Sequence, residues 1–221
     1  MRLVAPSLLA ADFLHLSQEV EFVNECGDIL HLDVMDGVLV PNISFGFSVV
    51  DAVAGLCRRP MDVHLMIVNP QNYIDRFAAA GAAMISFHLE AARKAGEDPS
   101  ALLEHIRSLG VKAGLVINPD VPVEDLYPYI GSADYILLMS VFAGFGGQSF
   151  IEATYDRLRA LRLEISRQGA SCLVEVDGGV TLSNADAVAE AGAQILVTGS
   201  AVFHAQDRKA AVNTIRGSQI I

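Results

Sequence analysis

The chain has 221 residues, a hydrophobic share of 52% and a formal net charge of −11. This length is enough for one domain with a sizeable core, which we expect to span residues 1–221. The negative charge argues against a nucleic-acid-binding surface, and Pro, Gly or charged residues break each apolar run well before the ~18 residues of a membrane span.

The opening segment and the cysteines favour a cytoplasmic protein. Pro6 interrupts the first apolar run and Asp12 follows it, which is typical of a first strand and not of a signal peptide. The cysteines lie far apart and form no C-x-x-C pair, so they predict neither a disulfide framework nor a Cys-rich zinc site. We expect each to be a thiol in the core: Cys26, Cys57 and Cys172.

Short apolar runs alternate with helical patterns along the chain. Asp98 and Pro99 predict a helix start, followed by an apolar stripe that ends at Gly110, and a second stripe from Ile151 stops near Gly169. Pro70 and Pro122 are expected to open further helices. The expected strands are Leu3–Leu8, Ile29–Val34, Met61–Ile67, Met84–Leu89, Lys112–Ile117, Tyr135–Ser140, Cys172–Asp177 and Gln194–Gly199.

Eight such strand and helix units predict a single-domain (β/α)8 TIM barrel of the α/β class. A doubly wound sheet of the dinucleotide-binding kind is the alternative, but it would place G-x-G-x-x-G after the first strand, where Pro6-Ser7-Leu8 stands instead. In a barrel, the C-terminal strand ends line the active site, so polar residues at those ends are the candidates for chemistry.

Two histidines and two aspartates stand at these strand ends. His31, Asp33 and Met35 alternate with apolar residues and therefore share one face of the second strand. His64 stands on the third strand and Asp177 ends the seventh, across the barrel mouth. Such a set predicts one divalent metal ion, with zinc expected first and iron, manganese or cobalt as substitutes, although a buried strand with hydrogen-bonded polar residues is the plainer interpretation of H-x-D alone.

Glycines follow the last three expected strands, at Gly144 to Gly147, Gly178-Gly179 and Gly199-Ser200. Phosphate groups in barrels commonly bind to backbone N–H groups at these loops. Neither Lys nor Arg occurs in the three segments, so a phosphate would be held by amides. For any single pair an ordinary tight turn is the alternative, and three successive clusters favour phosphate.

Five segments of the sequence resemble the ribulose-phosphate 3-epimerase family: HLDVMDGVLVPN (31–42), DVHLMI (62–67), MSVFAGFGGQSF (139–150), EVDGGV (175–180) and VTGSAVF (197–203). The resemblance implies that Asp33 and Asp177 exchange protons at C3 of the substrate. It also implies metal ligands and a pocket lining. The implied ligands are His31, Asp33, His64 and Asp177; the implied lining is Ser7, Met35, His64, Met66, Met139, Gly144, Gly146, Gly147, Asp177, Gly178, Gly179, Gly199 and Ser200.

The chemistry of these residues fits an epimerase without the family name. Inverting a carbon beside a ketone needs a base on one face and an acid on the other, which two facing carboxylates supply, and a divalent metal can neutralise the enediolate between them. No hydride carrier is needed. A non-catalytic sugar-phosphate-binding barrel is the rival, whereas a Schiff-base aldolase would need a strand-end lysine that the sequence does not offer.

The remaining expectations concern neighbouring residues. Glu175 and Asp62 should lie one layer deeper, where one of them orients His31 or His64. His88 and Glu90 are interpreted as satisfied polar residues at the rim, with a further catalytic pair as the alternative. The other histidines are interpreted as surface or packing residues: His15, His105 and His204.

Many family members read Asn-Pro where this chain has Phe142-Ala143. We expect the Phe142 ring to narrow the pocket, which favours D-ribulose 5-phosphate and D-xylulose 5-phosphate over the six-carbon D-allulose 6-phosphate. The expected partner is thus a small phosphorylated ketose, with neither nucleic acid nor membrane, in a homo-oligomer.

Overall fold

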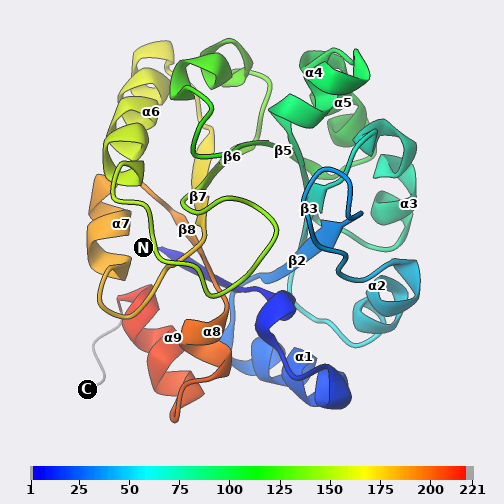
Figure 1. The fold of residues 1–221 in the computed structure, drawn as a ribbon, viewed down its shortest axis with the longest axis vertical. Helices are drawn as coiled ribbons and strands as arrows, with labels where there is room; N and C mark the ends of the chain where they lie inside the picture. The colour runs from blue at the N-terminus through cyan, green and yellow to red at the C-terminus, as the bar shows by residue number, and fades with distance from the viewer. Residues whose placement is uncertain (1, 218–221) are drawn as a thin grey trace.

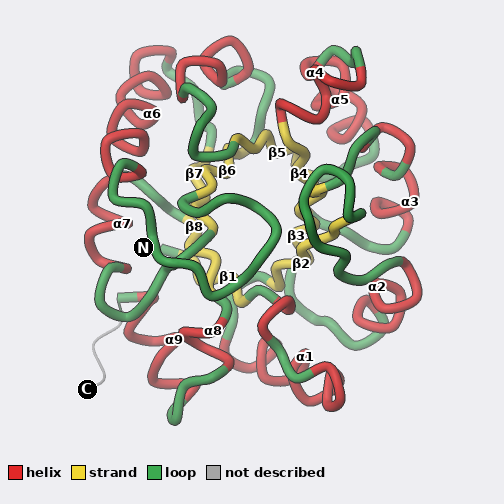
Figure 2. The backbone as a smooth tube through the Cα atoms, viewed as in Figure 1, coloured by secondary structure: helices red, strands yellow, loops and turns green. Residues whose placement is uncertain are grey.

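The computed structural model describes residues 2–217 and shows a ring of parallel strands surrounded by helices (Figures 1 and 2). All eight expected strands are present, several of them a residue or two shorter at their ends, so the predicted (β/α)8 barrel is confirmed. The strands are β1 (Leu3–Pro6), β2 (Leu30–Met35), β3 (Met61–Met66), β4 (Met84–His88), β5 (Lys112–Ile117), β6 (Tyr135–Met139), β7 (Leu173–Asp177) and β8 (Ile195–Thr198).

The sheet runs in the order β1-β8-β7-β6-β5-β4-β3-β2, and every ladder in it is parallel. The first strand therefore pairs with the last one, in a register that places Leu3 opposite Ile195. Between β1 and β2 the contact is a single parallel bridge that joins Ser7 to His31. The ring closes at this seam, next to residues predicted for the site.

Alternation along the strands separates two kinds of core. Leu30, Leu32 and Val34 point outward and belong to the large cluster between strands and helices, whereas Met35 packs with Met66 inside the barrel mouth. Deeper in the ring, the buried Tyr135 ring occupies the space beside Gly114, where an added Cβ would come within 2.3 Å of that ring. Gly114 is thus required by the close approach of a large interior side chain.

The helices form the outer layer of the barrel (Figure 2). Asp98 caps the fifth helix through its side chain with Pro99 behind it, and Gly169 ends the sixth in the left-handed conformation, as predicted. The helices are α1 (Leu16–Cys26), α2 (Phe47–Ala54), α3 (Ile74–Ala79), α4 (Leu89–Ala95), α5 (Pro99–Ser108), α6 (Thr154–Gln168), α7 (Ala185–Ala191), α8 (Ser200–Phe203) and α9 (Arg208–Arg216).

Pro70 and Pro122 stand at the start of helices, as predicted, but these are 3-10 helices and not α-helices: Pro70–Asn72 and Val123–Tyr129. In the second segment Pro128 removes a backbone donor, which prevents a regular α-helical ladder. The apolar stripes also extend past the helices, because Ile151 precedes α6 and Leu109 follows α5.

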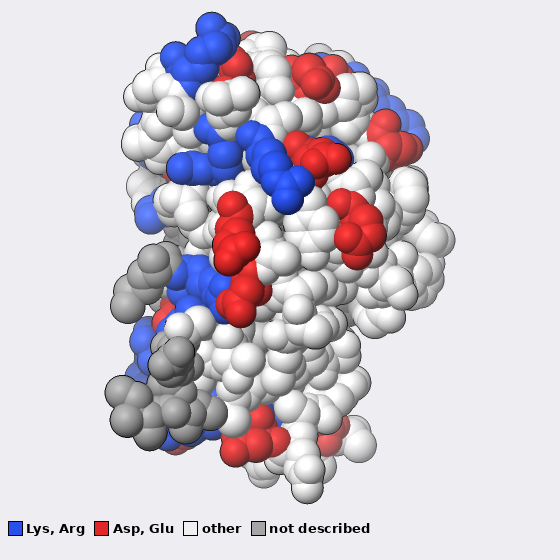
Figure 3. Space-filling model, turned by 90° about the vertical axis from the view of Figure 1, so that its left-hand side faces the viewer, with Lys and Arg blue, Asp and Glu red and all other residues white. Residues whose placement is uncertain are grey.

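Three further features of the described residues are their membrane-spanning potential, their cysteines and their surface charges. None of the helices in residues 2–217 is long and apolar enough to cross a membrane. The three cysteines are free thiols, but only Cys172 is buried, while Cys26 and Cys57 are half-buried at the edge of the core. The face drawn in Figure 3 carries basic and acidic side chains next to each other.

Candidate active site

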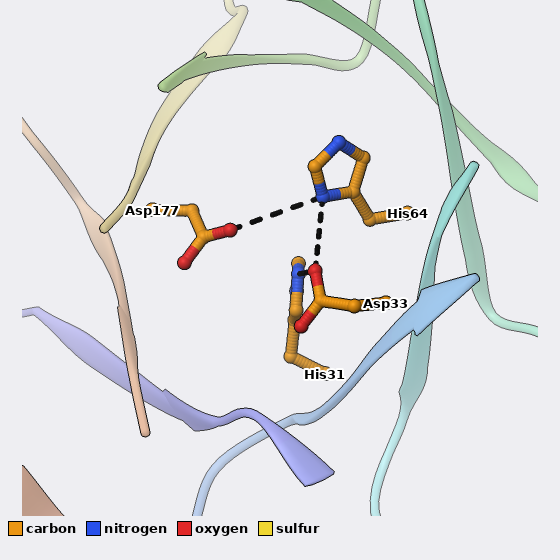
Figure 4. Close-up of side chains that lie close together, drawn as sticks. All are labelled: His31, Asp33, His64 and Asp177. Atoms are coloured by element: carbon orange, nitrogen blue, oxygen red, sulfur yellow. Dashed lines mark hydrogen bonds and ion pairs between the residues drawn. The ribbon is translucent and has the colours of Figure 1, made fainter. Parts of the chain in front are cut away.

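Four side chains from three strands meet at the mouth of the barrel (Figure 4). β2 supplies His31 and Asp33, β3 supplies His64, and β7 supplies Asp177 from the opposite wall. One ligand atom of each lies within 4.8 Å of the others. We call these four residues the metal cluster. Both imidazoles are fully buried, whereas the Asp177 side chain is 16% exposed toward the cavity.

The spacing within the metal cluster fits a small divalent cation. Asp33 Oδ1 lies 3.2 Å from His31 Nε2 and 3.2 Å from His64 Nδ1, and Asp177 Oδ2 lies 3.9 Å from His64 Nδ1. Ligands of a tetrahedral site with bonds of about 2 Å stand about 3.3 Å apart, so only small movements would bring these atoms into a coordination sphere. Two imidazoles with two carboxylates also suit zinc, iron, manganese or cobalt.

The two aspartates differ in proton affinity because their surroundings differ. Burial alone would raise the pKa of Asp33, but the imidazoles of His31 and His64 lower it below the usual range. Burial, together with the nearby charge of Asp33, raises the pKa of Asp177 to about 7. Near neutral pH one carboxylate is thus ionised while its counterpart across the cavity readily holds a proton.

A deeper layer of polar side chains orients His31. Its Nδ1 lies 2.6 Å from Asp62 Oδ2, and the Tyr135 hydroxyl donates to the other oxygen of Asp62 at 2.7 Å. Glu175 is fully buried beside this group, where burial and then the charge of Asp62 raise its pKa well above the usual range. The predicted contact between a deeper carboxylate and a cluster imidazole is confirmed for Asp62 and His31.

A cavity of about 530 Å³ opens above the metal cluster. His31 and His64 lie below its floor, whereas Asp33 and Asp177 reach it from opposite sides. Neither Lys nor Arg is among the described residues that line it. The other predicted pocket residues all line it: Ser7, Met35, Met66, Met139, Gly144, Gly146, Gly147, Gly178, Gly179, Gly199 and Ser200.

Three loops meet at the glycine side of the cavity. Gly179 has a φ of +62°, and a Cβ there would come within 2.5 Å of Phe150 N, so the seventh and sixth loops pack backbone against backbone. The sixth loop crosses the front of the strand ring in Figure 1. Asn42, from the second loop, donates through its Nδ2 to Gly144 O at 2.7 Å and joins these loops across the mouth.

Sequence reasoning missed several lining residues. Asn42 and Gln148 line the cavity and stand inside the motifs that resemble the family, where glycines and methionines were predicted as lining instead. Gln148 donates to Phe142 O and Phe145 O and so folds the sixth loop on itself. His204 is exposed as expected, yet it also lines the cavity, because the short α8 turns it toward the mouth.

Two expectations are wrong. Phe142 is 51% exposed and lies outside the cavity lining, so its ring does not narrow the pocket. The following residue, Ala143, packs inward instead and leaves the preceding ring in solvent. His88 is not at the rim: it is fully buried, and its Nε2 lies 2.9 Å from His64 Nε2.

Comparison with known proteins agrees with this geometry. A model of the "Ribulose-phosphate 3 epimerase family" matches residues 3–203. The chain belongs to this family. It is 46% identical to a ribulose-phosphate 3-epimerase of Synechocystis sp., with 98% of this chain and 94% of that protein covered. A ribulose-phosphate 3-epimerase of Bacillus subtilis is 44% identical, with 98% of this chain and 99% of that protein covered.

Solved structures show the same barrel in more distant proteins. A crystal structure of 3-hexulose-6-phosphate synthase superposes with a TM-score of 0.68 at 19% identity and covers 99% of both chains. At this identity the likeness concerns the fold alone. The family assignment therefore rests on the sequence relatives, and the chemistry on the residues at the mouth.

Proposed function

We propose that the protein is a 3-epimerase that interconverts D-ribulose 5-phosphate and D-xylulose 5-phosphate. The observation that carries this proposal is the pair Asp33 and Asp177, which face one cavity from opposite walls with different proton affinities. Ionised Asp33 would remove the proton from C3 on one face of the sugar. Protonated Asp177 would return a proton on the other face, which inverts the carbon.

The four residues of the metal cluster would hold one divalent ion, with zinc proposed first and iron, manganese or cobalt as substitutes. When bound, such an ion would supply positive charge beside the oxygens on which negative charge develops. Asp62 would keep His31 Nε2 aimed at the ion through the contact at His31 Nδ1. Ser7 donates through Oγ to Asp33 Oδ2 and would leave Oδ1 for the ion.

The phosphate of the substrate would lie at the three glycine loops. Gly146, Gly147, Gly178, Gly179, Gly199 and Ser200 line this end of the cavity. Since the described lining contains no Lys or Arg, backbone N–H groups would be the main donors to the phosphate oxygens. The methionines would cover the sugar with flexible apolar surface: Met35, Met66 and Met139.

Because Phe142 is exposed, a six-carbon substrate stays an alternative to the five-carbon pair. Since that ring does not occupy the cavity, the size argument against D-allulose 6-phosphate loses its support. The five-carbon pair stays the first proposal, because the relatives at 46% and 44% identity carry that name.

Side-by-side turnover assays test the function. Purified protein should convert ribulose 5-phosphate with a higher kcat/KM than allulose 6-phosphate, and prolonged chelation should abolish turnover until a divalent ion is restored. His64→Ala should lose both the ion and activity, with one ion per chain in the unmodified protein. Full activity after verified metal removal would refute the metal proposal, and preference for the hexulose would refute the substrate proposal.

The oligomeric state and the cellular location of the protein are also proposals. We propose a homo-oligomer, supported by apolar side chains that are exposed in the second loop, Val38 at 67% and Ile43 at 74%. A cytoplasmic location is supported by three unpaired thiols. Sedimentation at several protein concentrations would show whether a monomer is the main species.

A further inference from the structure

His64 has a second ring nitrogen that points away from the metal cluster. Its Nε2 lies 2.9 Å from His88 Nε2, and the two rings meet edge to edge, with their centroids 5.1 Å and their planes 18° apart. Both imidazoles are fully buried. A neutral imidazole carries one N–H and one lone pair, so one of these two facing nitrogens must donate while the other accepts.

Two proton arrangements satisfy this contact. In the first, His64 carries its proton on Nδ1 and donates to Asp33 Oδ1 at 3.2 Å, while its Nε2 accepts from His88. In the second, the proton is on Nε2 of His64, and His88 Nε2 accepts it. Only the second leaves a lone pair on His64 Nδ1, the atom that faces Asp33 and Asp177, so only the second can ligate a cation.

Two groups on the far side of His88 act in opposite directions. When His88 Nε2 accepts, the proton of His88 is on Nδ1, which lies 3.8 Å from Glu90 Oε1 and 3.5 Å from Asn118 Nδ2. The amide donor opposes a proton on Nδ1, but 3.5 Å is longer than a well-formed hydrogen bond, whereas the carboxylate attracts the N–H through its full charge. A negative charge beside Nδ1 stabilises the proton there and thereby keeps Nε2 free to accept.

Asn118, at the end of β5, holds Glu90 in this position. Its backbone N–H and its Nδ2 both donate to Glu90 Oε1, each at 3.1 Å. The Glu90 side chain is 29% exposed, so two donors on one oxygen are needed to keep it turned inward. The row Asn118, Glu90, His88, His64 thus runs from a strand end to the metal cluster, with every link within 4 Å.

We propose that His88 and Glu90 are positioning residues, which select the His64 tautomer that offers Nδ1 to a divalent ion. The inference rests on the metal site of the proposed function and adds two residues to it. His88 supplies the acceptor for His64 Nε2–H, and Glu90 supplies the charge that keeps His88 in the accepting form.

Cobalt(II) affinity tests the proposal without any substrate. It is measured by competition with a chromophoric chelator, and the visible absorption of bound cobalt reports its ligand geometry. His88→Leu removes the acceptor and should weaken cobalt binding about 10–100-fold with a changed spectrum. His88→Gln, whose amide oxygen can accept from His64, should restore most of the affinity and the spectrum.

Glu90→Gln should weaken cobalt binding because it removes the charge and leaves the shape. Glu104→Gln is the matched control, since Glu104 is exposed on α5, and it should bind cobalt like the unmodified protein. Because Glu90 lies at the edge of the core, this variant tests the proposal even where His88→Leu fails to fold. Unchanged cobalt affinity and spectrum in folded His88→Leu, or in Glu90→Gln, would overturn the proposal.

Cobalt affinity and epimerase turnover are measured independently, so they test the role of His88 and Glu90 separately from the proposed function. Absence of epimerase turnover in the cobalt-loaded protein would refute the epimerase proposal, while the variant affinities would still decide the role of His88 and Glu90. Turnover with unchanged affinities would support the epimerase and refute the tautomer selection.

Discussion

Asp33 and Asp177 show how position alone gives two identical side chains different chemistry. Asp33 faces two imidazoles and accepts from Ser7, all of which favour its charged form. Asp177 lacks such close partners and carries a pKa raised to about 7 by burial and by the charge of Asp33. In the metal-free protein Asp33 is therefore ionised near neutral pH, while Asp177 holds its proton up to about pH 7, as the proposed base and acid require.

The two-base mechanism predicts matched losses. Asp33→Asn and Asp177→Asn should each lower kcat by about 10²–10⁴-fold, because each amide removes a proton carrier. In D2O the product of the unmodified enzyme should gain deuterium at C3. Asp75→Asn, at an exposed residue of α3, serves as the control with normal turnover. Retention of the original hydrogen at C3 would contradict exchange through carboxylates.

The raised pKa of Asp177 also predicts a pH-dependent stability cost in metal-free protein. The folded state holds this proton up to about pH 7, whereas the unfolded chain loses it near the ordinary aspartate pKa of 3.8, so stability falls as pH rises between the two. Asp177→Asn should remove this cost. The free energy of unfolding in urea should therefore be higher for Asp177→Asn than for the unmodified protein, by more at about pH 8 than at about pH 4. An equal difference at both pH values would contradict this assignment.

At the scale of elements, one backbone N–H fixes the base of the sixth loop. Ala143 keeps its N–H, which donates to Asn118 Oδ1 at 3.1 Å. The same loop then continues through Gly144 to Gly147 along the cavity. A proline at this position could not make that bond, so the backbone N–H of Ala143 ties the base of the loop to the end of β5.

Ala143→Pro should therefore raise KM for the sugar phosphate by up to about tenfold, since one hydrogen bond at the loop base is lost. Cobalt affinity should stay unchanged, because Asn118 still donates twice to Glu90. Phe142→Ala is the control: its ring is exposed, and its removal should change neither quantity. A fall in cobalt affinity in Ala143→Pro would contradict this division of roles.

The elements also show which features sequence patterns can predict. Alternation placed His31 and Asp33 on the inner face of β2, because the period of a strand is fixed by its backbone. The expectations for His88 and Phe142, which did not rest on alternation, were wrong. Whether a strand-end histidine meets the rim or a neighbouring imidazole, and which side of a loop faces solvent, depends on packing between strands that no local pattern encodes.

At the scale of the whole molecule, the barrel completes the site by joining the two ends of the chain. β1 pairs with β8, with Pro6 opposite Thr198, and the next residue, Ser7, bridges to His31 and donates to Asp33. Gly199 and Ser200 follow β8 directly into the cavity lining. The residues of the metal cluster come from β2, β3 and β7, but their surroundings depend on β1 and β8.

A chain that ends at Ala193 tests this dependence. It keeps all four residues of the metal cluster and lacks β8, α8 and α9. Without β8 the first strand has no ladder partner, so we expect cobalt binding to be weakened at least about tenfold relative to the full chain. Addition of a separate fragment from residue 194 onward should restore it. Unchanged cobalt affinity in the shortened chain would contradict the expectation.

The pairing of β1 with β8 sets an order of events during synthesis. The ribosome releases the N-terminal residues first, yet β1 must wait for Ile195–Thr198 before it has a neighbour on that side. His31, Asp33 and His64 are therefore synthesised long before the barrel can close around them, and Asp177 follows on β7, the strand directly before β8. A nascent chain that ends before β8 would carry the four residues of the metal cluster without an enclosed site, so we expect an ion to bind only at the last stage of synthesis or after release.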